Sequence, residues 1–151
     1  MPRTMVLLVI VLVLSGVAPR AVAAALGDDV ATVETDRAHL RSALRVTRAA
    51  RYDVHELSGP TGTVVREYVS PDGRVFGVAW EGPWPPDLRQ ILGRYFDRFT
   101  AHVPSRRRGR RPLVVDEPDL VVVWSGHPRA FNGRAYVRSL LPAGIDAAII
   151  R

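Results

Sequence analysis

Two glutamates, Glu56 and Glu67, are the first side chains in this sequence that could do chemistry together. They lie in neighbouring segments, 52–57 and 63–69, that alternate apolar and polar residues as strands do. If both carboxylates face one side of a hairpin, they can share a proton or act as general acid and base, which would suit a small hydrolase assisted by His55 or His127. The alternatives are that each glutamate has an arginine partner, or that a register shift of one residue turns both toward water.

A second polar group on the same strands consists of His55, Arg66 and Tyr68. The predicted register puts them on the face opposite the two glutamates. Arginine and histidine can donate charge-assisted hydrogen bonds, so this trio could bind an anion or a carboxylate. The alternative is an ordinary solvated surface.

His127 lies between Gly126 and Pro128, on a loop where a histidine can act as a catalytic base. The sequence has no cysteine and no Gly-x-Ser-x-Gly motif, and Ser125 lies only two residues away, so no activated nucleophile can be recognised. The histidines also lack the spacing of metal ligands. The sequence therefore predicts neither a metal site nor a cofactor.

An arginine-rich loop, residues 104–112, carries five arginines: Arg106, Arg107, Arg108, Arg110 and Arg111. Such a loop could contact an anionic envelope component, namely phosphate-bearing lipid, acidic polysaccharide or an acidic partner protein. The alternative is an exposed loop without a partner, because five neighbouring guanidinium groups repel one another.

Two tryptophans flank Gly82-Pro83 and could form an aromatic platform for a sugar. We expect Trp80 to close the edge of the core, and leave open whether Trp84 belongs to the core or to a binding surface.

The amino terminus has the features of a cleaved export signal. Arg3 precedes an apolar run of about a dozen residues, which is short of the ~20 needed to span a bilayer. The small residues around Ala24 suit a signal peptidase. We expect a cleaved signal at 1–24, a single domain at 25–151, and no stable membrane span after cleavage.

Charge outside the arginine-rich loop is nearly balanced. The chain has a formal charge of +6 and all its basic residues are arginine. Without the signal and the arginine-rich loop the net charge falls to about −1. This argues against a nucleic-acid partner, which would favour arginine spread over a whole face. We expect a monomer.

The element pattern predicts an α+β fold in a single small domain. A short N-terminal helix is expected over 32–44, followed by a three-stranded antiparallel meander (52–57, 63–69 and 75–80) with a turn at 70–73. An amphipathic covering helix follows at 86–99, with its apolar residues spaced at i, i+3 and i+4. Further C-terminal strands are expected at 113–115, 120–124 and 130–137, with a break at Gly126-His127-Pro128 and a hairpin or a bulge at Asn132-Gly133.

The turn lengths suggest a register in which Leu57 opposes Val64 and Val69 opposes Arg74. One face of the meander is then mainly apolar and forms the core. Its members are Tyr52, Val54, Glu56, Val65, Glu67, Val69, Phe76, Val78 and Trp80.

Several strings of this sequence resemble an exported bacterial family. They include Ala25-Leu-Gly27, Arg51-Tyr-Asp-Val-His-Glu56, Thr63-Val-Val-Arg-Glu-Tyr-Val-Ser-Pro-Asp-Gly73, Trp80-Glu-Gly-Pro83 and Leu140-Leu-Pro-Ala-Gly144. Together they are similar to the family known as domain of unknown function 2844. The resemblance implies a small exported single-domain protein, without assigned activity or catalytic residues. We therefore expect a non-enzymatic binding or accessory module of the envelope or periplasm, with the hydrolase as the alternative.

Overall fold

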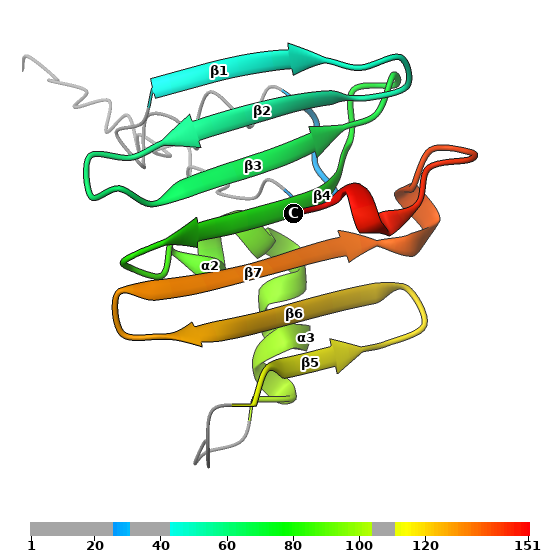
Figure 1. Ribbon diagram of the computed structural model, residues 1–151. Helices are drawn as coiled ribbons and strands as arrows, with labels where there is room; N and C mark the ends of the chain where they lie inside the picture. The colour runs from blue at the N-terminus through cyan, green and yellow to red at the C-terminus, as the bar shows by residue number, and fades with distance from the viewer. Residues whose placement is uncertain (1–25, 31–42, 104–110) are drawn as a thin grey trace, which may run out of the picture.

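The computed structural model describes residues 26–30, 43–103 and 111–151. The strands in these ranges form one antiparallel sheet of seven strands, in the order β1-β2-β3-β4-β7-β6-β5 (Figure 1). Two meanders, β1 to β4 and β5 to β7, are therefore joined side by side along β4 and β7. The strands are β1 (Ala43–Arg48), β2 (Asp53–Ser58), β3 (Val64–Val69), β4 (Val75–Gly82), β5 (Leu113–Asp116), β6 (Leu120–His127) and β7 (Ala130–Val137).

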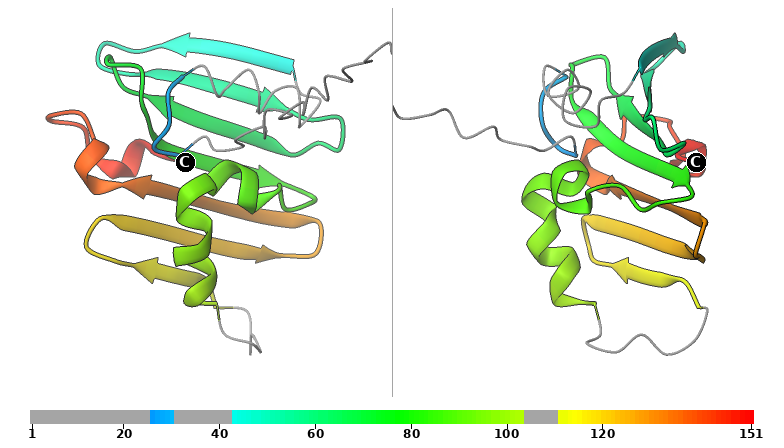
Figure 2. Two further views of the ribbon diagram at one scale, coloured as in Figure 1. Left: turned by 180° about the vertical axis from the view of Figure 1, so that it is seen from behind. Right: turned by 90° about the vertical axis from the view of Figure 1, so that its left-hand side faces the viewer.

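A helical segment connects β4 to β5 and covers one face of the sheet (Figure 2). Asp87 caps its first turn by accepting hydrogen bonds from the amides of Arg89 and Gln90. The predicted continuous helix is interrupted, because Gly93 adopts a left-handed φ of 49°. The segment consists of α2 (Leu88–Leu92), η1 (Gly93–Tyr95) and α3 (Phe96–Ala101).

The main core lies between this helical segment and the sheet. Ile91, Leu92 and Phe99 are buried against Val65, Val78 and Trp80 from β3 and β4, so the segment covers the sheet with its apolar side, as an amphipathic covering helix does. We call this side of the sheet the covered face. Phe96 is only partly buried there.

The segment 26–30 also belongs to the core. Leu26 is fully buried, and its amide donates to the Ile91 carbonyl. The Gly27 amide donates to the Val75 carbonyl, and the Val75 amide donates to the Asp28 carbonyl. The predicted helix at 32–44 mostly lies outside the described residues. Its last two positions are nevertheless strand, because Ala43 and Leu44 begin β1, which the sequence patterns did not reveal.

The predicted register between the first two strands of the meander is wrong by one residue. Leu57 opposes Val65, not Val64, so every β2 side chain lies on the face opposite to the one predicted. An irregularity at the end of β3 places Val69 opposite Val75, and Phe76 then falls outside the main core, in the cluster on the other face. Val65, Val69, Val78 and Trp80 share the covered face as predicted.

The second meander also differs from its prediction at its hairpin. Strand β6 continues through Gly126 to His127, and the chain reverses at Pro128 and Arg129, whose φ is 73°. The Asn132-Gly133 pair is neither a turn nor a bulge, since both residues lie inside the regular β6–β7 ladder. Gly133 is required there because a Cβ would meet the Trp80 ring at 2.2 Å.

The chain after β7 crosses to the face that the helix leaves uncovered (Figure 2). We call this side the open face. The crossing segment contains η2 (Arg138–Leu140) and η3 (Ala147–Ile149). Ile150 then packs, fully buried, against Tyr68, Phe76 and Ala79. It approaches the main chain at Gly77, where an added Cβ would lie 2.5 Å from the Ile150 Cδ1 atom.

Candidate functional site

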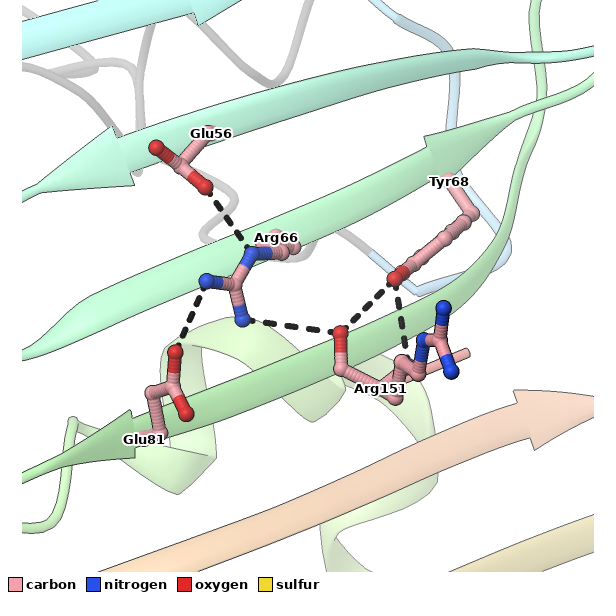
Figure 3. Close-up of polar contacts among 5 residues, drawn as sticks. All are labelled: Glu56, Arg66, Tyr68, Glu81 and Arg151. Atoms are coloured by element: carbon pink, nitrogen blue, oxygen red, sulfur yellow. Dashed lines mark hydrogen bonds and ion pairs between the residues drawn. The ribbon is translucent and has the colours of Figure 1, made fainter. Parts of the chain in front are cut away.

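An ion-pair cluster occupies the open face where β2, β3 and β4 lie side by side (Figure 3). The Arg66 Nε donates to Glu56 at 2.9 Å, and its Nη2 donates to Glu81 at 2.7 Å. Glu56 is directly opposite Arg66, and Glu81 lies diagonally across, two residues along β4 from Ala79, which opposes Arg66; the spacing of the sheet therefore brings the three side chains together. The guanidinium is thus held between two carboxylates.

The electrostatics of this cluster favour a permanently charged arginine. Partial burial of Arg66 acts to lower its pKa, but hydrogen bonds and attraction from Glu81 and Glu56 outweigh it and raise the pKa above its ordinary value. Arg66 therefore neutralises one of the two negative charges. It also has its third donor, Nη1, 3.5 Å from the main-chain oxygen of Arg151.

The last residues of the sequence are tied to this cluster through their main chain. The Tyr68 hydroxyl donates to the Arg151 oxygen at 2.9 Å and accepts from the Arg151 amide at 3.1 Å (Figure 3). On the other side, Arg134 of β7 donates to the Ile150 oxygen at 3.3 Å. The segment is thus fixed between β3 and β7, with its side chains at the edge of two hollows.

The first hollow, which we call the arginine pocket, has a volume of about 410 Å³. Its polar lining comes from Arg66, Glu81, Asn132, Arg134 and Arg151, and its apolar lining includes Val123 and Ile150. Within the described part of the chain, Arg134 and Arg151 form no ion pair with a carboxylate, in contrast to Arg66. Arg134 and Arg151 therefore bring two positive charges to the pocket, against the one negative charge that Arg66 leaves uncompensated on Glu56 and Glu81.

The second hollow, which we call the tyrosine hollow, has a volume of about 480 Å³. It is lined by Tyr52, Val54, Tyr68 and Ile149, and it shares Arg66, Glu81 and Arg151 with the arginine pocket. The Tyr52 ring is half-buried and packs edge-on against Phe76, with ring centroids 6.2 Å apart. The two hollows are therefore neighbours on one face and share three charged side chains.

The proposed pair of glutamates does not come together. Glu56 lies on the open face with Arg66 as its partner, whereas Glu67 is fully buried on the covered face. The shift in register separates them by the thickness of the sheet, so they cannot share a proton or act on one substrate bond. The alternative of an arginine partner is correct for Glu56.

The trio of His55, Arg66 and Tyr68 is also divided by the register. Arg66 and Tyr68 lie on the open face, but His55 lies on the covered face opposite Glu67. His55 lines a separate hollow of about 300 Å³ next to the turn at Ser70. Burial lowers the pKa of His55, and the nearby Asp53 carboxylate opposes this only in part.

Of the remaining candidates, Trp80 contributes to the lining of the arginine pocket, whereas His127 and Trp84 line neither open-face hollow. His127 is exposed at the β6–β7 hairpin, where its Nδ1 lies 3.1 Å from the Pro128 oxygen. Trp84 is 61% exposed and Trp80 is buried in the core. Of the arginine-rich loop, Arg106, Arg107, Arg108 and Arg110 lie outside the described residues, and Arg111 is exposed.

Sequence reasoning missed Glu81, Asn132 and Arg134, which line the arginine pocket. Asn132, Arg134 and Tyr136 alternate with small or apolar residues, and this period of two could have assigned them to one face. Their position next to Arg66 depends on the pairing of β4 with β7, which lie far apart in the sequence.

Within the described residues there is no group of three potential metal ligands, and no helix is long and apolar enough to cross a membrane. Comparison with protein families gives one result. The model of the family described as "Protein of unknown function (DUF2844)" matches residues 22–150. The chain belongs to this family. No curated protein and no solved structure matches the chain. Membership of DUF2844 agrees with the resemblance drawn from the sequence strings and adds no assigned activity.

Proposed function

We propose that this DUF2844 protein is an exported, non-enzymatic binding module of the bacterial envelope or periplasm. Its ligand is a small anion, and its binding site is the arginine pocket. The observation that carries the proposal is the pairing of a pocket of about 410 Å³ with two arginines, Arg134 and Arg151, that form no ion pair within the described residues. Ligand pockets typically have volumes of 300–1,000 Å³ and combine apolar walls with a few polar groups.

The charge distribution around the pocket supports an anionic ligand. Arg66 is already bonded to Glu56 and Glu81, so its charge is largely satisfied. A carboxylate or phosphate placed between Arg134 and Arg151 would accept charge-assisted hydrogen bonds, which are roughly twice as strong as neutral ones. Val123 and Ile150 supply apolar contact for the rest of the ligand.

The absence of a convergent acid and base supports binding over catalysis. Glu56 and Glu67 lie on opposite faces, and His127 lies at a distant hairpin. General acid–base catalysis requires the groups to reach the same substrate atoms. Nothing in the described residues brings the hydrolase candidates within such reach.

Export is supported by the apolar run that ends before Ala24 and by the position of Leu26. Leu26 is fully buried and its amide donates to the Ile91 carbonyl, so cleavage before Ala24 or Ala25 leaves all the core contacts of Leu26 intact, and cleavage directly before Leu26 leaves those of its side chain. Mass analysis of protein recovered from the cell envelope should therefore find an N-terminus between Ala24 and Leu26. An intact Met1 on the recovered protein would contradict the export part of the proposal.

Binding can be tested by thermal unfolding of the mature protein with small anions at constant ionic strength. Acetate, phosphate, malate and galacturonate form a suitable panel, with glucose as the neutral comparison. A ligand that binds the folded state raises the melting temperature according to its concentration relative to its Kd. We expect at least one acid to do so for the wild type.

Two arginine variants locate the effect. Arg134→Gln should remove the stabilisation by the acid, whereas Arg48→Gln, on the exposed edge strand β1, should retain it. Equal stabilisation of the wild type and Arg134→Gln would show that the acid binds elsewhere. No response to any acid would contradict the binding proposal.

A further inference from the structure

The two hollows on the open face share Arg66, Glu81 and Arg151, although one is rich in arginine and the other in tyrosine. A ligand confined to the arginine pocket would leave the adjoining tyrosine hollow unused. A longer ligand could occupy both, with its charge at Arg134 and a ring against Tyr52. Such a ligand rests on the binding function proposed above and specifies its chemical class.

We propose that the open face binds an acidic saccharide of at least two units, which places a carboxylate in the arginine pocket and a neighbouring sugar ring in the tyrosine hollow.

The main-chain groups of the sheet are not available to a ligand on the open face, so the ligand must be bound by side chains. Strands β3, β4 and β7 each have a neighbour on both sides, so their amides and carbonyls are used within the sheet. An extended peptide gains most of its affinity from main-chain hydrogen bonds at a free strand edge, which the middle of a sheet does not provide. The open-face groups offered to a ligand are therefore side-chain donors, acceptors and rings.

The polar groups of the arginine pocket match a molecule that carries both carboxylate and hydroxyl groups. Arg134 and Arg151 are donors for a carboxylate. Glu81 is 56% exposed, and its Oε1 atom bonds to Arg66, so its second oxygen remains an acceptor for a hydroxyl. Asn132 is exposed beside Ser125, whose hydroxyl donates to its Oδ1, and its amide nitrogen can donate to the ligand.

The tyrosine hollow offers the ring of Tyr52 as a contact for a sugar ring. Tyr52 is held by its ring contacts with Tyr68 and Phe76, so it is fixed before the ligand binds. Its hydroxyl has no hydrogen bond within the described residues, in contrast to the Tyr68 hydroxyl, which is bonded to Arg151. A rigid aromatic ring with a polar tip offers contact area at low entropic cost.

Titration calorimetry with oligogalacturonates of one to four units tests whether a ligand occupies the arginine pocket alone or both hollows. We expect the dimer or trimer to bind at least about tenfold more tightly than the monomer, because a second ring then enters the tyrosine hollow. Neutral malto-oligosaccharides of the same lengths should bind at least about tenfold more weakly than the acidic series. A tetraglutamate peptide is the acidic comparison without sugar rings.

Variants separate the two hollows. Tyr52→Ala should abolish the gain with length while leaving monomer affinity within about twofold of the wild type. Arg134→Gln should weaken all acidic oligomers, and Arg48→Gln should change none of them. A circular dichroism melt of each variant establishes that it is folded. Tyr52→Phe keeps the aromatic ring and should retain the increase in affinity with oligomer length that Tyr52→Ala loses.

The outcomes distinguish the inference from the proposed function. Equal affinity for monomer and trimer, or tighter binding of tetraglutamate, overturns the saccharide inference and leaves a small-anion site in place. A gain with length that survives Tyr52→Ala also overturns it. Failure of every acid, including the monomer, overturns the proposed function itself.

Discussion

On the covered face, Val65, Val78 and Trp80 are shielded from solvent by the helical segment, whereas Arg66 and Glu81, their neighbours along the same strands, contact solvent on the open face. Strand geometry alone explains the alternation, because successive side chains point to opposite sides of a sheet. The difference between the faces lies in what covers them. A helical segment excludes water over one face, and among the described residues the segment around Ile150 lies over part of the other (Figure 2).

This comparison suggests where stability and binding are located. Close-packed apolar side chains on the covered face contribute most of the free energy of folding. The charged groups of the open face are half-exposed, and such groups contribute little to stability while remaining able to exchange partners. Substitutions on the two faces should therefore differ in size and in kind.

The largest effect is expected for Phe99 on the covered face. Phe99→Ala should lower the free energy of unfolding by about 3 to 5 kcal/mol, because the ring is buried against the core and leaves a cavity. Phe96→Ala in the same helix should cost about 1 to 2 kcal/mol, since that ring is only partly buried. Urea unfolding of both variants measures the difference, and equal losses would show that the core does not extend as described.

A somewhat smaller effect is expected where the last residues pack on the open face. Ile150→Ala should cost about 2 to 4 kcal/mol, since Ile150 is fully buried against Tyr68, Phe76 and Ala79. Gly77→Ala should cost about 1 to 3 kcal/mol, because its Cβ would overlap the Ile150 side chain.

The two open-face substitutions should not be additive. In the Ile150→Ala background the overlap is relieved, so Gly77→Ala should then cost much less than in the wild type. A double-mutant cycle by urea unfolding gives this coupling directly. Full additivity would place the Ile150 side chain away from Gly77.

Local sequence signals predicted those parts of the fold that depend on neighbours in the chain. The turn from Ser70 to Gly73, the meander strands and the stripe of the helical segment were all recognised. The β2–β3 register was not, because the loop from Gly59 to Thr63 permits pairings that differ by one residue. Strand β1 was missed because Leu44 also fits the helical spacing of the residues before it.

The candidate site shows the same division. An arginine partner for Glu56 was among the open alternatives. It could be considered because Glu56 and Arg66 lie on strands that are consecutive in the chain. The arginine pocket could not be predicted, since it requires β7 to lie next to β4 rather than at the edge of the sheet. No turn residues in the sequence predict that pairing. It arises because the helical segment crosses the covered face and the second meander then pairs its last strand, β7, with β4 (Figure 1).

Arg66 should show the modest energetics expected of the open face. Arg66→Met should lower the free energy of unfolding by about 1 kcal/mol, because it keeps most of the side-chain length but leaves Glu56 and Glu81 without their shared cation. Adding Glu56→Gln should recover part of the loss by removing one of the two negative charges. Added salt should also reduce the loss, since exposed charges are screened. A loss of several kcal/mol that does not change with added salt would contradict this, because it would mean that the ion-pair cluster stabilises the fold as strongly as the buried core does.

The smallest effect concerns His55 on the covered face, and it should appear as a dependence on pH. Burial lowers the pKa of His55 in the folded protein, so the unfolded chain binds a proton more readily than the folded one. Stability contributed by the neutral imidazole is complete above the unfolded pKa of about 6.5 and is lost as pH falls through the lower folded pKa.

His55→Gln should flatten this decline in stability on the acid side. Asp53→Asn should steepen it, because Asp53 raises the pKa of His55 and its removal lowers that pKa further. Thermal melts from pH 7.5 to 5, with NMR titration of the His55 ring, measure both effects. A pKa of His55 above 6.5 in the folded protein would contradict this by showing that a neighbouring carboxylate outweighs burial, and a decline unchanged by His55→Gln would assign it to other groups.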